Sequence, residues 1–260
     1  MAVQYREYRK EYQSLLDGAY GIQDHNANER GIRLALETAV LPDLIIKLYT
    51  EHYTYPWLKS LMINRLRGLK NELSLDYIPV KNSKLTMRFY HKKASAKSSD
   101  NKDWFDKALF YTSYKYSIRI RHLLSASFSI KSQFDYTIVR SGGIEGDDSR
   151  GSLLALDIFY HPTLLPVKLS FRYAIFNTDD FSSRLYAYEN DVLYASSMPA
   201  YYGKGYRSYL LIKYKASQWL DAWLRLSLTR FTDRNTISSG PAEIGGNKLP
   251  EIKIQLRLKL

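Results

Sequence analysis

Lysine and arginine recur at every second position over several stretches of this sequence. In residues 114–122 (YKYSIRIRH), Lys115, Arg119 and Arg121 alternate with tyrosine and isoleucine, and residues 252–260 (IKIQLRLKL) repeat the pattern. A strand with this alternation presents all its cations on one face. The formal net charge is +12, which favours an anionic partner such as a phospholipid head group, lipopolysaccharide, nucleic acid or an acidic solute.

Other reactive groupings are weak in this sequence. The five histidines are scattered without the short spacing of a metal site, and the chain has no cysteine. Neither a GxSxG motif nor a Walker loop occurs. The sequence therefore predicts no catalytic residue, no metal site and no cofactor, and we expect that the chain is not an enzyme.

Two weaker alternatives concern acidic and serine–histidine chemistry. Residues 146–148 (GDD) offer carboxylates to a Ca²⁺ ion, although an acidic loop tip is usually only solvated. His122 with Ser125, or His161 with Ser152, could pair as in outer-membrane phospholipases, which are twelve-stranded barrels. No surrounding motif supports either pair.

The elements that carry the basic side chains are predicted to be strands. A period of two runs through nearly the whole chain, and the best helical candidate, residues 58–69, is short. The 23 tyrosines also favour strands. We expect twelve strands near residues 2–13, 28–40, 44–56, 70–79, 84–93, 110–122, 124–140, 151–161, 166–177, 205–215, 219–231 and 251–260.

The connections between these strands alternate between short and long. The short ones are at 41–43, 80–83, 123, 162–165 and 216–218, and the long ones are at 14–27, 57–69, 94–109, 141–150, 178–204 and 232–250. This alternation is typical of outer-membrane barrels. The sequence therefore predicts one domain over residues 1–260: an all-β, antiparallel transmembrane β-barrel of about twelve strands in a bacterial outer membrane, with short periplasmic turns and long extracellular loops. The first strand could pair with the last and close the barrel.

A soluble β-sandwich or lipocalin-like barrel would show similar alternation with the faces reversed. The long strands and the regular order of turns favour the membrane barrel. Met1 is followed directly by AVQYREYRKEY, which is no signal peptide. We expect either a processed chain that starts at an added methionine or a piece of a longer chain.

In a barrel, the polar face of each strand lines the lumen. Basic side chains outnumber acidic ones on that face, and an open lumen would then prefer anions. The alternative is that the charges pair across strands and only solvate the interior. The predicted basic lumen residues are Arg33, Lys47, Arg88, Lys115, Arg119, Arg121, Lys131, Arg172, Arg207, Lys213, Arg225, Lys253 and Arg257.

The opposite face is predicted to meet lipid. His52, His91 and His122 fall on it near strand ends, at a depth that tolerates a neutral imidazole. An aromatic girdle is expected from Tyr53, Tyr55, Trp57, Tyr160 and Trp219.

The connection at 178–204 is too aromatic and too apolar for a freely solvated loop. We expect it to fold into or over the barrel mouth, with Arg184, Glu189 and Asp191 pairing with the basic wall. The alternative is that it forms the outer part of long strands. The residues predicted to form this plug are Arg184, Tyr186, Tyr188, Glu189, Asp191, Tyr201 and Tyr202.

One part of the chain resembles a known family. Residues 183–215 (SRLYAYENDVLYASSMPAYYGKGYRSYLLIKYK) and the strands after them resemble the C-terminal barrel of a Bacteroidota outer-membrane family that carries an N-terminal helix-hairpin-helix segment. The motifs are Arg184 with Tyr186 to Asp191, and Pro199 to Gly205. The helix-hairpin-helix segment is not in this sequence, so we do not expect nucleic acid as a partner of this segment. The resemblance implies a location more firmly than a function.

We therefore expect a porin-like barrel that passes or binds anionic solutes, or that anchors a larger assembly in the membrane. The alternative is a non-conducting barrel that serves as scaffold or subunit of a secretion or nucleic-acid-handling complex. The expected partners are outer-membrane lipid or lipopolysaccharide, an anionic solute and other envelope proteins.

Overall fold

The computed structural model describes residues 1–13, 21–22, 27–58, 65–97, 108–142, 148–238 and 240–259. Residues 146 and 147 of the possible Ca²⁺ site, and residues 59–64 of the possible helix at 58–69, lie outside the described residues. No helix in the described part is long and apolar enough to cross a membrane.

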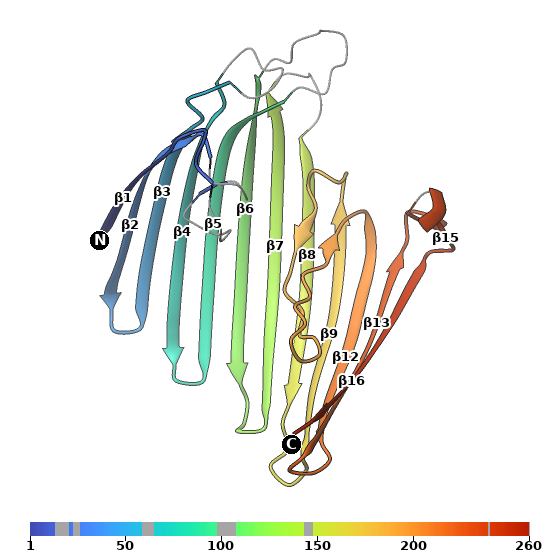
Figure 1. Cartoon of the computed structure of the whole chain (residues 1–260). Coiled ribbons are helices and arrows are strands. Elements are labelled where there is room, and N and C mark those ends of the chain that lie inside the picture. The colour runs from blue at the N-terminus through green and yellow to red at the C-terminus, as the bar shows by residue number, and fades with distance from the viewer. Residues whose placement is uncertain are drawn as a thin grey trace. The chain divides into compact units, whose positions relative to one another are not determined.

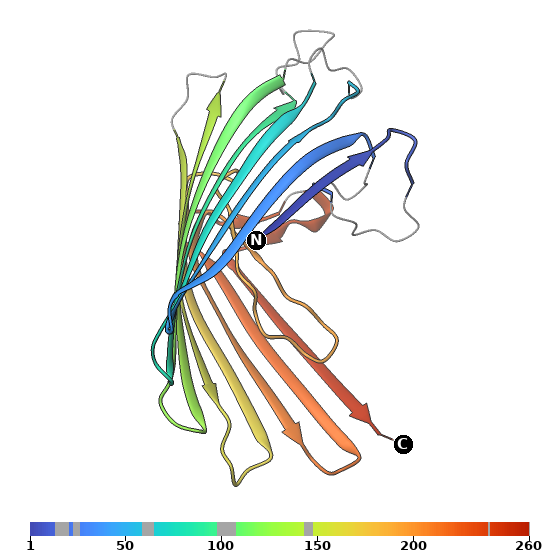
Figure 2. The same ribbon diagram turned by 90° about the vertical axis from the view of Figure 1, so that its left-hand side faces the viewer.

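The chain forms antiparallel strands throughout (Figures 1 and 2). Twelve of them pair in one sheet in the order β1-β2-β3-β4-β5-β6-β7-β8-β9-β12-β13-β16. Their bounds are β1 Ala2–Tyr8, β2 Glu29–Leu41, β3 Leu44–Thr54, β4 Arg67–Val80, β5 Ser83–Lys97, β6 Ala108–Leu123, β7 Phe128–Gly142, β8 Ser149–Tyr160, β9 Val167–Thr178, β12 Lys204–Lys215, β13 Leu220–Phe231 and β16 Lys248–Leu258. Two small ladders join β10 (Leu185–Tyr186) to β11 (Ala200–Tyr201) and β14 (Thr236–Ile237) to β15 (Ile244–Gly245), and η1 (Gly240–Ala242) is a single 3₁₀ turn.

Each strand predicted from the sequence corresponds to one of these twelve, and short and long connections alternate as expected. Several predicted strand ends were wrong by a few residues, and two of these differences have a clear cause. β1 ends at Tyr8 rather than at residue 13, because the chain turns where the Tyr12 amide bonds the Arg9 carbonyl at 3.1 Å. The turn after β6 is longer than Leu123, because the amides of Leu124 and Ser125 both bond the Phe128 carbonyl.

β1 and β16 stand at the two ends of the strand order. The pairing of the first strand with the last, expected from the sequence, stays a prediction. The contacts divide the chain into two compact units, which we describe separately. Unit 1 consists of Met1–Asp76, Arg88–Tyr116 and Ile138–Asp148, and unit 2 consists of Tyr77–Met87, Ser117–Thr137 and Ser149–Leu260.

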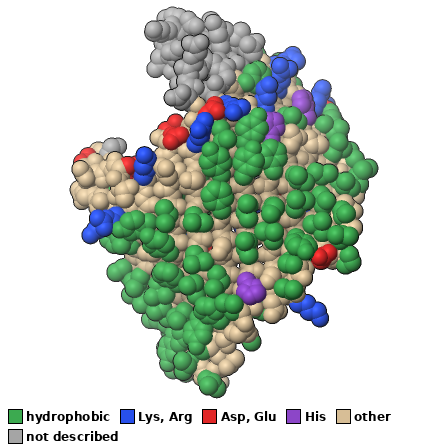
Figure 3. Space-filling model, turned by 180° about the vertical axis from the view of Figure 1, so that it is seen from behind, with side chains coloured by type: hydrophobic (Ala, Val, Ile, Leu, Met, Phe, Trp, Pro, Cys, Tyr) green, Lys and Arg blue, Asp and Glu red, His purple; other side chains and the backbone are tan. Residues whose placement is uncertain are grey.

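The two faces of the sheet in unit 2 reverse the usual distribution of polarity. On β16, Ile252 is 68% exposed and Ile254 is 73% exposed, whereas Arg172 on β9 is 1% exposed and Arg225 on β13 is fully buried. Soluble domains bury aliphatic side chains and leave arginine in water. An apolar outer face over a charged inner face is the arrangement of a membrane barrel, and Figure 3 shows hydrophobic side chains covering the outer face. We call the two faces the lipid face and the polar face.

The polar face of unit 1 is built around a buried arginine. The guanidinium of Arg6 on β1 lies 2.6 Å from a Glu29 carboxylate oxygen and 2.5 Å from one of Glu51. Gly31 faces this guanidinium, and a Cβ at Gly31 would approach it to 2.9 Å. Because Gly31 has no side chain, the Arg6 guanidinium fits at this position without a steric clash.

The predicted aromatic girdle needs a correction in unit 1. Tyr53 and Tyr55 are 3% and 6% exposed and pack with Leu66 in a buried cluster. They alternate with the outward His52, so they fall on the polar face. Trp57, Tyr160 and Trp219 are exposed, as a girdle requires.

A lysine introduced on the lipid face tests the orientation of the sheet. Leu154 lies mid-strand on β8 and is 55% exposed. We expect Leu154→Lys to lower the free energy of unfolding in lipid vesicles by about 2–4 kcal/mol, the cost of a lysine near the bilayer midplane. Leu164→Lys, in the turn after β8, is the matched control and should leave stability within about 0.5 kcal/mol. Equal stability of both variants in urea titrations would contradict the membrane orientation.

Candidate functional site

The connection from β9 to β12 folds into a hairpin, which we call the 179–203 hairpin. β10 and β11 pair within it through Leu185 with Tyr201 and Tyr186 with Ala200, and a further bridge joins Glu189 to Ser197. At its tip, Tyr194 adopts a φ of 63° and is 89% exposed. The backbone bonds of the hairpin are thus largely internal, and its attachment to the sheet depends on side chains.

Asp180 fixes the start of the hairpin. One of its carboxylate oxygens accepts hydrogen bonds from the Ser149 hydroxyl at 2.8 Å and from the amide and hydroxyl of Ser182 at 2.7 and 2.6 Å. Burial raises the pKa of Asp180, but these hydrogen bonds outweigh it, so the pKa lies below its ordinary value.

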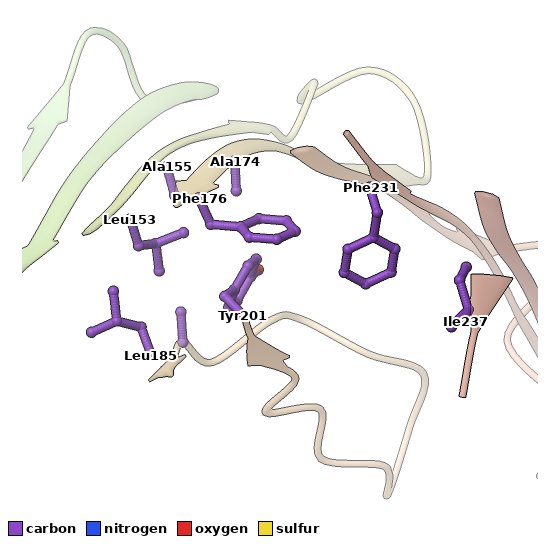
Figure 4. Close-up of a cluster of buried hydrophobic side chains, with 9 residues drawn as sticks. Leu153, Ala155, Ala174, Phe176, Leu185, Tyr201, Phe231 and Ile237 are labelled. Atoms are coloured by element: carbon purple, nitrogen blue, oxygen red, sulfur yellow. The ribbon is translucent and has the colours of Figure 1, made fainter. Parts of the chain in front are cut away.

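An apolar cluster holds the hairpin against the polar face of unit 2 (Figure 4). The sheet carries small residues at this point, and Ala155 and Ala174 are paired neighbours on β8 and β9. A Cβ at Gly151 would come within 2.3 Å of the Ser183 carbonyl oxygen, so a larger residue there would push the hairpin away. The members of the cluster are Leu153, Ala155, Ala174, Phe176, Leu185, Ala187, Tyr201, Phe231 and Ile237.

Glu189 of the hairpin is the centre of the polar contacts and is fully buried. Arg207 Nε donates to one carboxylate oxygen at 2.8 Å, and Arg207 Nη2 donates to the other at 3.0 Å. The Tyr201 hydroxyl donates at 2.7 Å, and the Arg225 guanidinium forms a further short ion pair. A carboxylate buried in a medium of low polarity requires this number of donors.

A second hairpin carboxylate, Asp191, lies beside the first. Lys253 Nζ on β16 donates to it at 2.8 Å, and Arg225 Nε lies 3.7 Å away. Burial raises the pKa of Asp191, but the hydrogen bonds from Lys253 and the Val192 amide outweigh it and lower the pKa below its ordinary value. We call the polar face of β8, β9, β12, β13 and β16 the wall. Two acidic side chains of the hairpin thus contact the basic part of this wall, which consists of Arg207, Arg225 and Lys253.

The wall beneath the hairpin is itself ordered by strand register. Asp157, Arg172, Tyr209, Ser227 and Glu251 are directly paired neighbours across β8, β9, β12, β13 and β16. Arg172 donates two hydrogen bonds, of 2.5 and 2.7 Å, to the carboxylate of Asp157. The Tyr209 ring lies under the guanidinium groups of both Arg172 and Arg225, at 5.8 and 5.1 Å from its centroid. Strand register therefore brings these side chains side by side on the polar face.

The structure divides the predicted lumen cations into two groups. The first group has carboxylate partners within 4 Å: Arg33, Lys47, Lys131, Arg172, Arg207, Arg225, Lys253 and Arg257. Arg207, Arg225 and Lys253 pair with the hairpin carboxylates Glu189 and Asp191, and the other five pair across strands, which fits the alternative for those five. For the second group, no ion pair with a carboxylate is found among the described residues: Arg88, Arg119, Arg121 and Lys213. Lys115 has an interaction partner and belongs to neither group, and Lys213 lies over the Trp223 ring at 5.0 Å.

The predicted plug residues also separate. Glu189, Asp191 and Tyr201 meet the wall as described above, but Arg184 does not pair with it. Its guanidinium donates instead to the Tyr186 hydroxyl at 2.6 Å and lies 4.1 Å from the Phe181 ring centroid. The side chains of Tyr186 and Tyr188 are exposed. Tyr202 contacts Phe181 and Phe231 at the base of the hairpin.

Sequence reasoning missed two contributors. Asn190 holds the backbone of the hairpin, because its carbonyl accepts from Arg225 Nε at 3.2 Å and its amide donates to the Tyr209 hydroxyl at 3.2 Å. Arg6 was not among the predicted lumen cations. Its alternation with the exposed Val3 and Tyr5 is a period-two signal that could have placed it on the polar face.

The structure does not support the alternative metal site or the alternative pairing of His122 with Ser125. Within the described ranges, no group of three His, Asp or Glu side chains could hold a metal ion. His122 Nδ1 lies 2.6 Å from the hydroxyl of Ser83 rather than from that of Ser125.

The sheet order, the reversed polarity of its faces and the alternation of connections define the fold of an outer-membrane β-barrel. Comparison with solved structures agrees. The chain is similar to the copper transporter OprC, with a TM-score of 0.53 and 10% sequence identity, over 88% of this chain and 40% of that one. It is also similar to the closed form of the ferric-catecholate import receptor Fiu from E. coli K12, with a TM-score of 0.51 and 8% identity, over 88% of this chain and 45% of that one.

This chain therefore spans less than half the length of these two neighbours. No protein-family model matches the sequence, and no curated protein matches it significantly. The predicted fold class is confirmed, and the fold supports the predicted outer-membrane location.

Removing the charge of Glu189 tests what holds the hairpin. We expect Glu189→Gln to leave Arg207 and Arg225 buried with too few partners and to weaken the docked hairpin by about 3–5 kcal/mol. Limited proteolysis at the hairpin tip would measure this as faster cleavage. Glu243→Gln, at an exposed carboxylate after η1, is the control and should cleave at the wild-type rate. Unchanged cleavage of Glu189→Gln would show that the apolar cluster alone suffices.

Acid should release the hairpin. Asp180 and Asp191 have lowered pKa values when docked, so docking is favoured above their ordinary value of 3.8 and loses this contribution as pH falls below it. Hydrogen exchange of residues 187–198, corrected for the intrinsic rate, should therefore lose protection as the pH falls below about 4. Asp191→Asn should be less protected at neutral pH and should change less on acidification. Protection of the wild type that is independent of pH would refute this reading.

Proposed function

We propose that this chain is the barrel part of an outer-membrane protein that binds or passes anionic solutes, and that the 179–203 hairpin occupies the anion site. The observation that carries the proposal is the placement of Glu189 and Asp191 among Arg207, Arg225 and Lys253. With the hairpin docked, these three cations face three carboxylates, because Glu251 also lies here. With the hairpin displaced, the three cations would face Glu251 alone, and an anion would replace the lost partners.

A second basic cavity of unit 2 supports passage as well as binding. It lies at the short-turn end of the polar face, has a volume of about 260 Å³, and is lined in part by Arg121, Lys131 and His161. Burial and the nearby charge of Lys168 lower the pKa of His161, so this imidazole is neutral at pH 7. The cavity's charge then comes chiefly from Arg121, because Lys131 pairs with Asp157 at 3.1 Å. An anion that leaves the hairpin site would meet these cations next.

The two structural neighbours are a copper transporter and an import receptor, and transport across the membrane is consistent with that shared fold. The alternative is a non-conducting anchor or scaffold. The dense ion pairs around Glu189 favour it, because a permanently docked hairpin would keep the polar face occupied. The resemblance to the Bacteroidota family stays a prediction.

Planar-bilayer recording distinguishes these functions. The protein should show little current when the hairpin is docked. A Glu189→Gln/Asp191→Asn double variant should show larger steps, with a reversal potential in a KCl gradient that indicates chloride preference over potassium, because the wall loses two negative charges.

The matched control is Glu11→Gln/Glu243→Gln, which removes two exposed carboxylates and should behave as the wild type. Cation preference of the hairpin variant would refute the anion site. Absence of current from both wild type and hairpin variant, with the protein correctly inserted, would favour the scaffold.

A further inference from the structure

The lipid face of unit 1 carries an unusual pair of cations. Arg67 begins β4, and Lys93 lies near the end of β5. Both lie over one aromatic ring, that of Phe110 on β6, at 5.4 and 5.7 Å from its centroid. Within the described part of the chain, neither cation has a carboxylate partner. The ring attracts each cation, but two positive charges near one ring also repel each other, and an anion bound near both would relieve that repulsion.

The cations border a cavity on the same face. Its volume is about 280 Å³, and its lining includes His52, Arg67, Leu69, Lys93 and Phe110. The cavity thus combines two fixed cations and an imidazole with an apolar floor. Such a lining suits a ligand with a charged head and an apolar body.

A polar line runs across the neighbouring strands beside the cavity. The Thr50 hydroxyl donates to the Asn71 side-chain oxygen at 2.7 Å, and the Asn71 side-chain nitrogen lies 3.1 Å from His91 Nδ1. The His91 ring stacks on Tyr114 at 5.1 Å, and Arg140 lies over that same tyrosine at 5.6 Å. Polar side chains that meet lipid over several adjacent strands mark the head-group depth of the membrane.

The site lies at the end of the sheet where the connections are long, which is the extracellular end of this fold. A lipid-facing arginine or lysine costs about 2–4 kcal/mol at the bilayer midplane but about 0–1 kcal/mol near the interface. In Figure 3, blue and purple side chains lie along the upper edge of this face, above most of the green ones, while a few others lie lower and toward the left edge. The location is therefore that of the outer-leaflet head groups.

We propose that this surface binds a phosphorylated lipid head group of the outer leaflet, as in the lipid A part of lipopolysaccharide. Its phosphate lies between Arg67 and Lys93, where arginine offers paired donors and lysine a point charge. The apolar part of the lipid lies along Leu69 and the neighbouring apolar side chains of the lipid face. The apolar floor favours a lipid over free phosphate, because a free ion would gain nothing from it.

Native mass spectrometry of the intact protein, released from detergent after mixing with lipid, tests the proposal. The probes are bis-phosphorylated lipid A, dephosphorylated lipid A, and inorganic phosphate. We expect bis-phosphorylated lipid A to be retained. Arg67→Gln/Lys93→Gln should weaken the apparent affinity for bis-phosphorylated lipid A by about tenfold or more. Dephosphorylated lipid A should bind the wild-type protein as weakly as bis-phosphorylated lipid A binds this double variant.

The matched control is Arg150→Gln/Lys204→Gln. These two exposed cations are the second residue of β8 and the first of β12, at the same end of the sheet and on the lipid-face register of their strands. The control should retain lipid A as the wild type does. Equal loss in both double variants would reduce the effect to general charge and overturn the site. The proposal would also be overturned if the wild-type protein retained dephosphorylated lipid A as well as bis-phosphorylated lipid A, or if it retained inorganic phosphate as well as lipid A. Heat-dependent gel mobility would show that each variant is folded.

Discussion

The arrangement of the polar face of unit 2 depends on one buried carboxylate. Glu189 accepts from Arg207, Arg225 and Tyr201, three residues that strand register or the hairpin ladder brings to one point. Without that carboxylate, Arg207 and Arg225 would share a buried region with too little compensating charge. The hairpin thus binds the polar face through Glu189, and the same carboxylate allows Arg207 and Arg225 to be buried.

A second constraint comes from the surroundings of the sheet. In lipid, backbone groups must be satisfied by strand pairing, so the side chains alone decide which face meets hydrocarbon. The exposed Ile252 and Ile254 and the buried Arg172 and Arg225 follow from that rule. The same rule makes the basic residues near Phe110 informative, because a cation on the lipid face needs a reason to be there.

The sequence predicted the sheet well because a period of two depends only on neighbouring residues. All twelve strands, the order of turns and the face of most cations follow from local alternation. The ends of strands were less predictable, since the turn at Arg9 and the wider turn before Phe128 depend on specific backbone hydrogen bonds. Tyr53 and Tyr55 were assigned to a girdle from residue type, although their alternation with His52 already put them on the other face.

The site was predictable in composition but not in pairing. Glu189 and Asp191 attract attention as acids in an aromatic connection, yet Arg184 is equally prominent and bonds Tyr186 instead. Which acid meets which cation depends on the register between β12, β13 and β16 and on the room left by Gly151 and Ala174. Those relations join residues distant in sequence, and no local pattern encodes them.

The internal ladder of the 179–203 hairpin has a consequence for assembly. β9 and β12, which it connects, pair directly along their whole length, and the hairpin bonds chiefly to itself through β10 and β11. The sheet can therefore form and enter the membrane while this connection is still undocked, and docking can follow as a separate, later step. A newly inserted molecule would pass through a stage in which its basic wall is uncovered before its own carboxylates reach it.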